Sequence, residues 1–296
     1  MSYQSHNFEV IDPNALTANA GGKWHGHYGA APCPICQPER RKDQNALSIK
    51  LTGDRLLLNC KKAGCDFRDL LASLGIRPGG YEIDRAAQAE AERKQAEYAA
   101  KVLARAREMW RETDHINGTM AEAYLRSRGI TCDLPPSLRF HPKAYHGPRK
   151  QGLPAMVSDV AKTGGIHRTF FELDGNRLDR HAKMMQGPCR GSAVRLSETL
   201  GPLVVCEGIE TGLSLLSGLL SGPHTVWAAL STSGIKGLHL PKRVGDLIVA
   251  RDGDDAGKLA ANGLASRAHA AGWKVKIMPA PDGLDFNDVL QTKGGF

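Results

Sequence analysis

The chain has 296 residues, room for about two domains of ordinary size, and its 39 Lys and Arg against 31 Asp and Glu give a formal net charge of +8. With 41% hydrophobic and 24% charged residues, this composition excludes a disordered chain, a collagen and a small disulfide-rich protein. No apolar run approaches the roughly 20 residues that span a bilayer, and the first residues lack the apolar core of a signal peptide. We therefore expect a cytoplasmic protein with no membrane partner, and the positive charge favours a polyanionic partner.

A cysteine-rich region follows a polar segment, residues 1–22, that we expect to be a flexible arm. Two pairs of closely spaced cysteines come next: Cys33 and Cys36, then Cys60 and Cys65. The residues between the pairs, 46–50 and 55–59, predict a β-hairpin. Four thiolates at the ends of short strands can surround one Zn²⁺ tetrahedrally, which predicts one structural zinc ion in a small β module, a zinc ribbon, over residues 23–80. Free cysteines, or a shell in which His25 or His27 replaces one cysteine, remain as alternatives.

Basic and aromatic side chains surround the cysteine pairs. Arg41 and Lys61 are among the basic residues, and Trp24 offers a ring on which an unpaired base can stack. We expect this module to bind single-stranded nucleic acid through such residues. A metal-stapled docking module that binds no nucleic acid is the alternative interpretation of the same residues.

A long helix is predicted after the cysteine region, as a linker over residues 81–115. From Ile83 to Glu112 the sequence is rich in Ala, Glu, Lys and Arg and contains no Gly or Pro. Opposite charges four residues apart support a helix, while an apolar stripe appears only in its second half. We therefore expect a solvated connecting helix that packs against the rest of the protein at its end alone.

The remainder of the chain divides into a basic α+β subdomain, residues 116–200, and an α/β domain, residues 201–296. Short strands are predicted at 155–160 and 166–172 in the first of these. In the second, short apolar strands at 203–206, 247–250 and 273–278 alternate with helical patterns. Strands that alternate with helices are typical of parallel βαβ units, so the fold class is α/β.

Acidic residues follow each of the three predicted parallel strands: Glu207, then Asp252 and Asp254, then Asp285 and Asp288. Because the carboxyl ends of parallel strands meet at one edge of a sheet, we expect these side chains to converge. Converging carboxylates favour a hard divalent cation such as Mg²⁺ or Mn²⁺. The glycines between and after the acids allow a tight turn and the close approach of a phosphate. Taken alone, however, an Asp-Gly-Asp sequence is typical of a turn.

The sequences Val-Cys-Glu-Gly-Ile-Glu-Thr (205–211) and Arg-Asp-Gly-Asp-Asp-Ala-Gly (251–257) resemble a Toprim domain, the catalytic fold that bacterial-type primases, topoisomerases and some nucleases share. Residues 283–290 are similar to a further acidic motif of bacterial-type primases, and residues 33–74 resemble the primase zinc ribbon. Residues 123–130 and 165–170 resemble the Toprim primases of phages and mobile elements. The order of these segments along the chain is that of a primase.

This resemblance implies a DNA primase, a nucleotidyltransferase that synthesises short RNA primers on single-stranded DNA from nucleoside triphosphates during DNA replication. A 3′-hydroxyl attacks an α-phosphate, and two Mg²⁺ or Mn²⁺ ions can activate the hydroxyl and neutralise the leaving group. The implied catalytic and metal-binding residues are Glu207, Asp252, Asp254 and Asp285, with Asp288 as a further metal ligand. Asn287 stands where the primases tend to carry an acid.

The triphosphate also needs cations, and the candidates precede the Toprim motifs: Arg168, Lys183, Arg190 and Arg195. Residues 253–259 depart from the phosphate-binding loop of a helicase motor, so we expect a separate replicative helicase as partner. A Toprim-type nuclease and a catalytically silent single-stranded nucleic-acid-binding protein are the alternatives to a primase.

Overall fold

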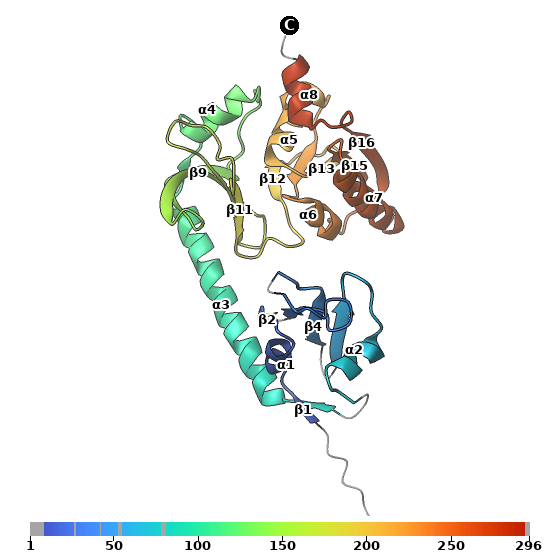
Figure 1. The fold of residues 1–296 in the computed structure, drawn as a ribbon. Coiled ribbons are helices and arrows are strands. Elements are labelled where there is room, and N and C mark those ends of the chain that lie inside the picture. Colours follow the sequence, from blue (N-terminus) through green and yellow to red (C-terminus); the bar gives the residue numbers. More distant parts are fainter. Residues whose placement is uncertain (1–8, 27, 42, 53–54, 78–80, 294–296) are drawn as a thin grey trace, which may run out of the picture. The chain divides into compact units, whose positions relative to one another are not determined.

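The computed structural model describes residues 9–26, 28–41, 43–52, 55–77 and 81–293 (Figure 1). The chain forms two compact units, residues 1–100 and 101–296. Their boundary falls inside helix α3 (Arg85–Arg111), so the predicted linker belongs to both units. The predicted α+β subdomain and α/β domain form one unit, because a single apolar core contains residues of both, among them Met156 and Val204.

The first unit contains a four-stranded antiparallel sheet in the order β2-β3-β4-β5. Its strands are β2 (Lys23–Trp24), β3 (Gly29–Ala31), β4 (Leu47–Thr52) and β5 (Arg55–Cys60). β4 and β5 form the predicted hairpin, although its turn residues lie outside the described part. Helix α2 (Phe67–Ser73) packs Leu70 and Leu71 against the apolar side of the sheet.

The flexible arm predicted for residues 1–22 is wrong from residue 9 onward, and residues 1–8 lie outside the described part. Strand β1 (Glu9–Ile11) pairs with β6 (Tyr81–Ile83), and helix α1 (Pro13–Asn19) follows it. The proline that suggested a loop occupies the first helical turn, where a missing N–H costs nothing. Gly21, with φ at +75°, follows the helix, as glycines commonly do at a helix C-terminus.

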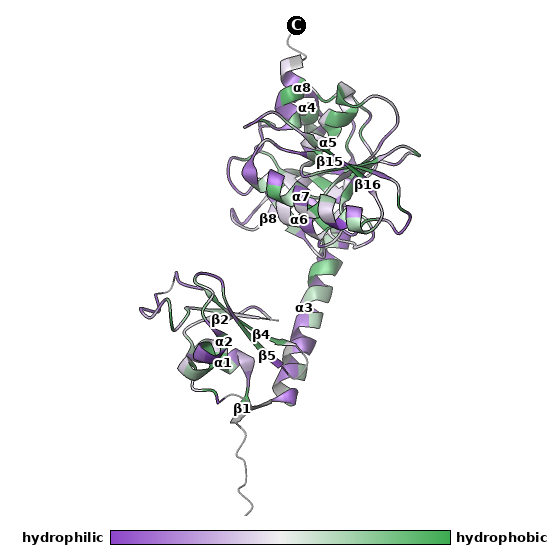
Figure 2. Cartoon of the chain, turned by 90° about the vertical axis from the view of Figure 1, so that its right-hand side faces the viewer, coloured by the Kyte–Doolittle hydropathy of each residue, from purple (hydrophilic) through white to green (hydrophobic). Residues whose placement is uncertain are grey.

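Helix α3 occupies most of the predicted linker, residues 81–115. Its first half is solvated, with Arg93 bonded to Glu90 and Glu97 on the same helix. In its second half Ala106 is fully buried against the neighbouring sheet, together with partly buried Met109. Figure 2 shows this change along α3, which is hydrophilic at its start and hydrophobic near its end. Of the helices that the structure describes, none has the length and apolar character needed to cross a membrane.

The second unit begins with a five-stranded antiparallel sheet in the order β11-β10-β9-β8-β7. Its strands are β7 (Asp114–His115), β8 (Leu138–His146), β9 (Gln151–Asp159), β10 (Ile166–Phe170) and β11 (Lys183–Gln186). One face, with Val157 and Phe170, packs against the end of α3. The other face, with Leu138 and Met156, packs on helix α4 (Met120–Ser127) and on the second sheet.

The second sheet has the order β12-β14-β13-β15-β16. Its strands are β12 (Val194–Ser197), β13 (Leu203–Cys206), β14 (Thr225–Ala228), β15 (Asp246–Arg251) and β16 (Lys274–Pro279). β13, β15 and β16 are parallel, as predicted; the sheet also contains a further parallel strand, β14, and an antiparallel edge strand, β12, neither of which was predicted.

Helices cover both faces of this second sheet (Figure 1). Helices α6 (Thr232–Gly237) and α7 (Asp255–Ala270) share one apolar core with it. Helix α5 (Ile209–Ser214), a π-helical turn at Leu215–Leu219 and helix α8 (Phe286–Lys293) pack in the other. The carboxyl ends of the parallel strands therefore open between helix N-termini, which places polar groups at that edge.

Candidate functional site

The predicted acidic residues lie at the carboxyl ends of three neighbouring strands. Glu207 directly follows β13, Asp252 directly follows β15, and Asp285 lies between β16 and α8. β15 pairs with both β13 and β16, so Asp252 is the central residue of the three. The negative charges of Glu207, Asp285 and Asp254 all act on Asp252. We call these four residues the acidic edge; they converge as predicted.

The ionised form of Asp252 is disfavoured at the acidic edge. Burial, followed by the charges of Glu207, Asp285 and Asp254, raises the pKa of Asp252 to about 6. Its Oδ1 atom is buried and has no hydrogen-bond partner among the described residues. Burial and the charge of Asp254 also raise the pKa of Glu207. A buried carboxylate oxygen without a partner costs free energy, and a divalent cation would remove that cost.

Asp254 and Asp285 each begin a helix. Asp254 is the N-cap of α7, and its Oδ1 accepts a hydrogen bond from the backbone N–H of Gly257 at 2.6 Å. Oδ1 of Asp285 accepts from the backbone N–H groups of Asn287 and Asp288, at 2.8 and 2.9 Å. In both residues the cap occupies Oδ1. The geometry therefore orients each carboxylate through one oxygen while the other oxygen can serve a cation.

The acidic edge fits an open divalent-cation site rather than a closed one. Among the residues that the structure describes, the four cysteines are the one group of three or more His, Cys, Asp or Glu whose ligand atoms lie within 4.8 Å of one another. The carboxylates thus do not enclose a cation by themselves. Mg²⁺ commonly binds through one or two carboxylates and completes its shell with waters and substrate phosphates, so the donor set fits it.

The glycine between the two aspartates has a different role from the predicted one. A Cβ at position 253 would overlap the carbonyl oxygen of Pro281, so the chain itself fills the space that a phosphate was expected to enter. Gly253 N–H donates to the carbonyl of Leu284 at 2.8 Å, and Gly283 N–H donates to the carbonyl of Gly253 at 3.1 Å. These hydrogen bonds of Gly253 connect the loop that carries Asp252 and Asp254 to the loop that precedes Asp285.

Asp288 and Asn287 make structural contacts. Oδ2 of Asp288 accepts from the backbone N–H of Asp285 at 3.0 Å, which completes a reciprocal capping pair, and a metal-binding role for Asp288 stays a prediction. Asn287 is fully buried, and its Nδ2 donates to the carbonyl of Arg128 and to Oγ of Ser214, both at 2.9 Å. A carboxylate could not donate these bonds. This explains why an amide stands where primases tend to carry an acid.

Lys183 is a predicted phosphate-binding cation that lies near the acidic edge. It begins β11, and its positive charge opposes the rise in the pKa of both Glu207 and Asp252. Its Nζ lies 3.0 Å from Oε2 of Glu210, one helical turn after Glu207. The Lys183 side chain is 40% exposed, whereas that of Glu210 is 9% exposed. Lys183 therefore remains accessible to a ligand at this edge.

Arg168 lies on the face of its sheet that packs against α3. Its Nη1 donates to the carbonyl of Tyr145 at 3.1 Å, and its guanidinium lies 5.3 Å from the centroid of the Phe170 ring. The residue is 6% exposed, and burial lowers its pKa. Neighbouring strand residues point to opposite faces, and it is His167, not Arg168, whose pKa responds to Glu210. The position of Arg168 favours packing over nucleotide binding.

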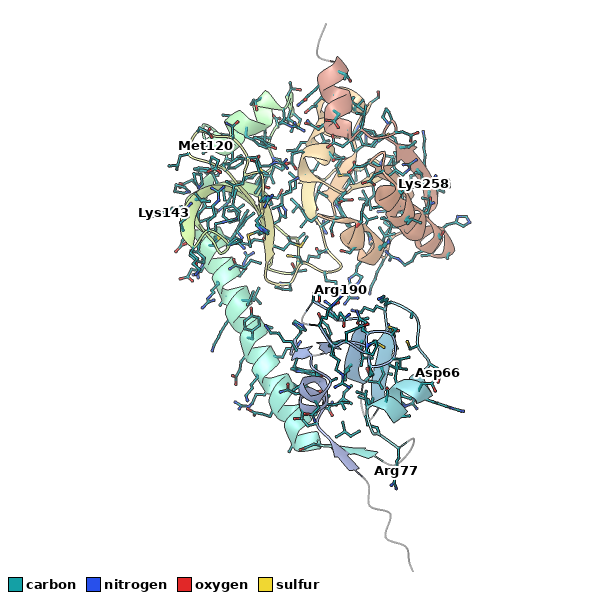
Figure 3. The ribbon with its side chains drawn as sticks, viewed as in Figure 1. Asp66, Arg77, Met120, Lys143, Arg190 and Lys258 are labelled. Atoms are coloured by element: carbon teal, nitrogen blue, oxygen red, sulfur yellow. The ribbon has the colours of Figure 1, made fainter. Side chains whose placement is uncertain are left out.

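The remaining two predicted cations lie in or before β12. Arg195 forms an ion pair with Glu198, and its guanidinium lies 4.5 Å from the centroid of the Trp227 ring. Arg190 is exposed in the connection between β11 and β12, where Figure 3 labels it. Nucleotide binding by these two residues stays a prediction.

The structure adds three residues that sequence reasoning missed: Glu210, Tyr124 and His167. Oη of Tyr124 donates to Oε1 of Glu210 at 3.4 Å, and burial and the Glu210 charge raise the pKa of Tyr124 to about 12. Burial and the nearby Lys183 charge lower the pKa of His167 to about 4, so its ring is neutral at pH 7. All three residues belong to sequence segments that carried the family resemblance. For Glu210 the sequence did offer a signal, because an acid within an otherwise apolar helical pattern is expected to have a buried partner.

The four cysteines form a compact cluster in the first unit. The Sγ atoms of Cys33 and Cys65 are 3.8 Å apart, and those of Cys36 and Cys60 are 3.4 Å apart. A tetrahedral Zn²⁺ site with Zn–S distances of about 2.3 Å needs S···S separations of about 3.8 Å. The donor set and spacing therefore suggest zinc binding. His25 is not a member of the cluster, and His27 lies outside the described residues.

Backbone N–H groups favour a thiolate at Cys60, whereas burial and the neighbouring thiols raise the pKa of Cys65 to about 12. Burial raises the pKa of Cys60, but hydrogen bonds from the N–H groups of Ala63, Cys65 and Lys62 outweigh it and bring the pKa to about 6. Thiolate is the form that binds Zn²⁺. The turn after β5 therefore stabilises the ionised form of Cys60, the form that binds a metal ion.

The predicted nucleic-acid-binding residues lie on or near the four-stranded sheet of the first unit. Arg41 is exposed and pairs with Asp43 at 3.4 Å. Nζ of Lys61 lies 5.8 Å from the centroid of the Tyr28 ring. Trp24 is half-buried, with its Nε1 atom buried and without a partner among the described residues. Binding of nucleic acid by Trp24, Arg41 and Lys61 stays a prediction.

Two family models match the second unit. Residues 202–295 match the Toprim domain, which confirms that this part of the chain is a Toprim domain. Residues 100–196 match a family described as Domain of unknown function (DUF7146). No curated protein matches the chain.

Solved structures of primases are similar at low identity. The zinc-binding and RNA polymerase domains of the Aquifex aeolicus primase are 15% identical with a TM-score of 0.39, over 96% of this chain and 80% of that chain. The primase fragment of the bacteriophage T7 primase-helicase protein is 14% identical with a TM-score of 0.35, over 90% and 98%. A DNA primase domain from Pseudomonas aeruginosa is 18% identical with a TM-score of 0.39, over 66% and 75%.

Proposed function

We propose that this protein is a DNA primase that joins ribonucleotides on a single-stranded DNA template by divalent-metal-dependent nucleotidyl transfer. One observation carries the proposal: in the described part of the chain, Asp252 of the Toprim domain has a buried carboxylate oxygen without a hydrogen-bond partner, and three further acids surround it. Such a site is suited to a cation that also contacts substrate phosphates. The zinc-type cysteine cluster in the same chain supports a primase over other Toprim proteins.

The residues of the second unit divide the chemistry among them. Mg²⁺ or Mn²⁺, when bound, would supply a Lewis acid for the attacking hydroxyl and the leaving pyrophosphate. Asp254 and Asp285 would hold the cations through the carboxylate oxygens that their helix caps leave available, and Asp252 through its buried Oδ1 atom. Glu207 has a raised pKa, which suits either a metal ligand or a group that accepts the proton of the 3′-hydroxyl. Lys183 would bind the triphosphate.

The first unit would bind the template. We infer one structural Zn²⁺ per chain at the four cysteines, and contacts to unpaired bases and phosphates through Trp24, Arg41 and Lys61. Binding through phosphates should weaken as the salt concentration rises. A separate replicative helicase would open the duplex.

The test is a primer-synthesis assay. Purified protein is incubated with single-stranded DNA, labelled ribonucleotides and Mg²⁺ or Mn²⁺, and the products are separated by length. Short RNA products that disappear in Asp252→Ala, and persist in the control Asp246→Ala at the other end of β15, are expected. Degradation of the DNA without synthesis would identify a Toprim nuclease. Template binding with neither reaction would identify a catalytically silent protein.

A further inference from the structure

Glu210 is an acid that lies inside the second unit rather than on its surface. It stands in the first turn of α5, and its side chain is 9% exposed. Burial opposes its ionisation, but the charge of Lys183, a backbone hydrogen bond and the hydrogen bond from Lys183 together outweigh burial and hold the pKa of Glu210 below its usual value. A buried charge is retained only where a partner compensates it. The carboxylate therefore depends on Lys183, with Tyr124 as a further hydrogen-bond donor.

The pair joins the two sheets of the second unit beside the acidic edge. Lys183 begins β11 of the antiparallel sheet, whereas Glu210 lies three residues after Glu207 on the Toprim side. Their contact, 3.0 Å between Nζ and Oε2, is the hydrogen bond that connects the lysine to the Toprim domain. Without it, a half-exposed lysine at the end of a strand would sample many rotamers.

A hydrogen bond from Ser214, which Asn287 in turn supports, holds the backbone of Glu210 in place. Oγ of Ser214 donates to the Glu210 carbonyl at 2.8 Å, and Nδ2 of Asn287 donates to Oγ of Ser214 at 2.9 Å. The backbone N–H of Asn287 in turn donates to Oδ1 of Asp285. A continuous set of hydrogen bonds therefore relates the position of Glu210 to that of Asp285 in the acidic edge.

A lysine held in this way keeps donors for a ligand. Its ammonium has three N–H donors, and Glu210 takes one of them. In protein kinases a lysine on a strand is likewise held by a glutamate on a helix while it contacts nucleotide phosphates. Since Lys183 is 40% exposed and its charge reaches Glu207 and Asp252, a phosphate bound at the acidic edge lies within its reach.

We propose that Glu210 is a positioning residue that holds the Lys183 ammonium at the acidic edge for the phosphates of a nucleoside triphosphate. The choice of a triphosphate rests on the proposed function. Glu210 itself touches no substrate; it acts through Lys183. Loss of its charge should therefore weaken nucleotide binding without unfolding the protein.

The test measures binding of a non-hydrolysable nucleoside triphosphate with Mg²⁺ by calorimetry, without template. Glu210→Gln keeps the shape and the acceptor for Tyr124 but removes the charge, and we expect its Kd to rise about tenfold, or about 1.4 kcal/mol. Glu210→Asp keeps the charge on a shorter side chain, and a smaller rise of about threefold is expected. Lys183→Gln should weaken binding at least as much as Glu210→Gln, and the double variant no more than Lys183→Gln alone.

The matched control is Glu172→Gln, which removes the carboxylate of the exposed Arg149–Glu172 pair in the same unit and should leave Kd unchanged. Thermal unfolding of each variant separates lost binding from lost folding; if Glu210→Gln does not fold, Glu210→Asp takes its place in the cycle. Unchanged or tighter binding in Glu210→Gln overturns the proposal. It is also overturned if the rise in Kd of the double variant equals the product of the rises in the two single variants. A wild-type protein that binds the nucleotide with this coupling but makes no primer supports the positioning role and refutes the primase.

Discussion

Replacement of Asp252 by asparagine should stabilise the metal-free protein while abolishing its activity. The two side chains have the same shape, so the change removes a charge and little else. In the absence of a divalent cation, Asp252 at pH 8 is ionised beside Glu207, Asp254 and Asp285, and burial adds to that repulsion. Under the proposed function, a cation bound at the acidic edge offsets this cost, and such a compromise between stability and activity is common at functional sites.

The size of the effect follows from the pKa of Asp252. Its rise from 3.8 to about 6 spans about two pH units, and each unit corresponds to about 1.36 kcal/mol. The ceiling is therefore about 3 kcal/mol. Because the side chain is partly exposed, solvent screening should reduce this to about 1–1.5 kcal/mol. For a unit of about 200 residues, this corresponds to a Tm higher by about 2–6 °C.

The size of the effect depends on pH. A carboxyl group whose pKa is raised by folding binds its proton more tightly in the folded state. The destabilisation of wild type is therefore complete only well above the folded pKa of about 6, decreases as the pH falls through that value, and disappears below the unfolded pKa of 3.8, where Asp252 is protonated in both states. Asp252→Asn should show its full advantage at pH 8 and only a small part of it at pH 4.

Thermal unfolding with EDTA at both pH values measures this difference. Addition of MgCl₂ at pH 8 should raise the Tm of wild type more than that of Asp252→Asn, because the cation binds the folded carboxylate. Asp246→Asn, at the amino end of the same strand, is the matched control and should change little. Equal Tm values of wild type and Asp252→Asn at pH 8, or the same gap at both pH values, would refute the electrostatic account of this site.

Three further substitutions test the fold around the two sites. Cys60→Ser should remove bound zinc, about one ion per chain by elemental analysis, and unfold the first unit by circular dichroism; full zinc content in this variant would contradict a four-cysteine shell. Gly253→Ala forces a methyl group into the carbonyl of Pro281 and should cost about 1–3 kcal/mol in denaturant unfolding, whereas an unchanged midpoint would mean that the two loops separate freely. Asn287→Asp removes two buried hydrogen bonds, including that to Arg128, and buries a charge, so we expect a loss of about 3 kcal/mol or more; a gain in Mg²⁺ affinity without that loss would instead make position 287 a metal ligand.

Much of the fold could be predicted from local patterns. The alternation of apolar strands with helices indicated the parallel sheet, and the strand at 203–206 has the predicted bounds. The linker helix and the hairpin between the cysteine pairs were also predicted from composition and turn residues. These elements depend on periodicity within a few residues, which a single sequence displays. The prediction for residues 9–22 was wrong, because proline and glycine mark helix ends as well as loops.

For the acidic edge, the sequence by itself determined which carboxylates meet, since parallel strands bring their ends together wherever they lie in the chain. The spacing of the two cysteine pairs likewise determined that the four thiols form one cluster. Only the tertiary structure decided that Lys183 reaches the acidic edge while Arg168 faces away, since each strand residue can lie on either face of a sheet. It alone decided that Glu210 holds Lys183 and that Asn287 supports Glu210 through Ser214. These contacts join residues that are far apart in the sequence, and no local pattern encodes the partner of a buried polar group.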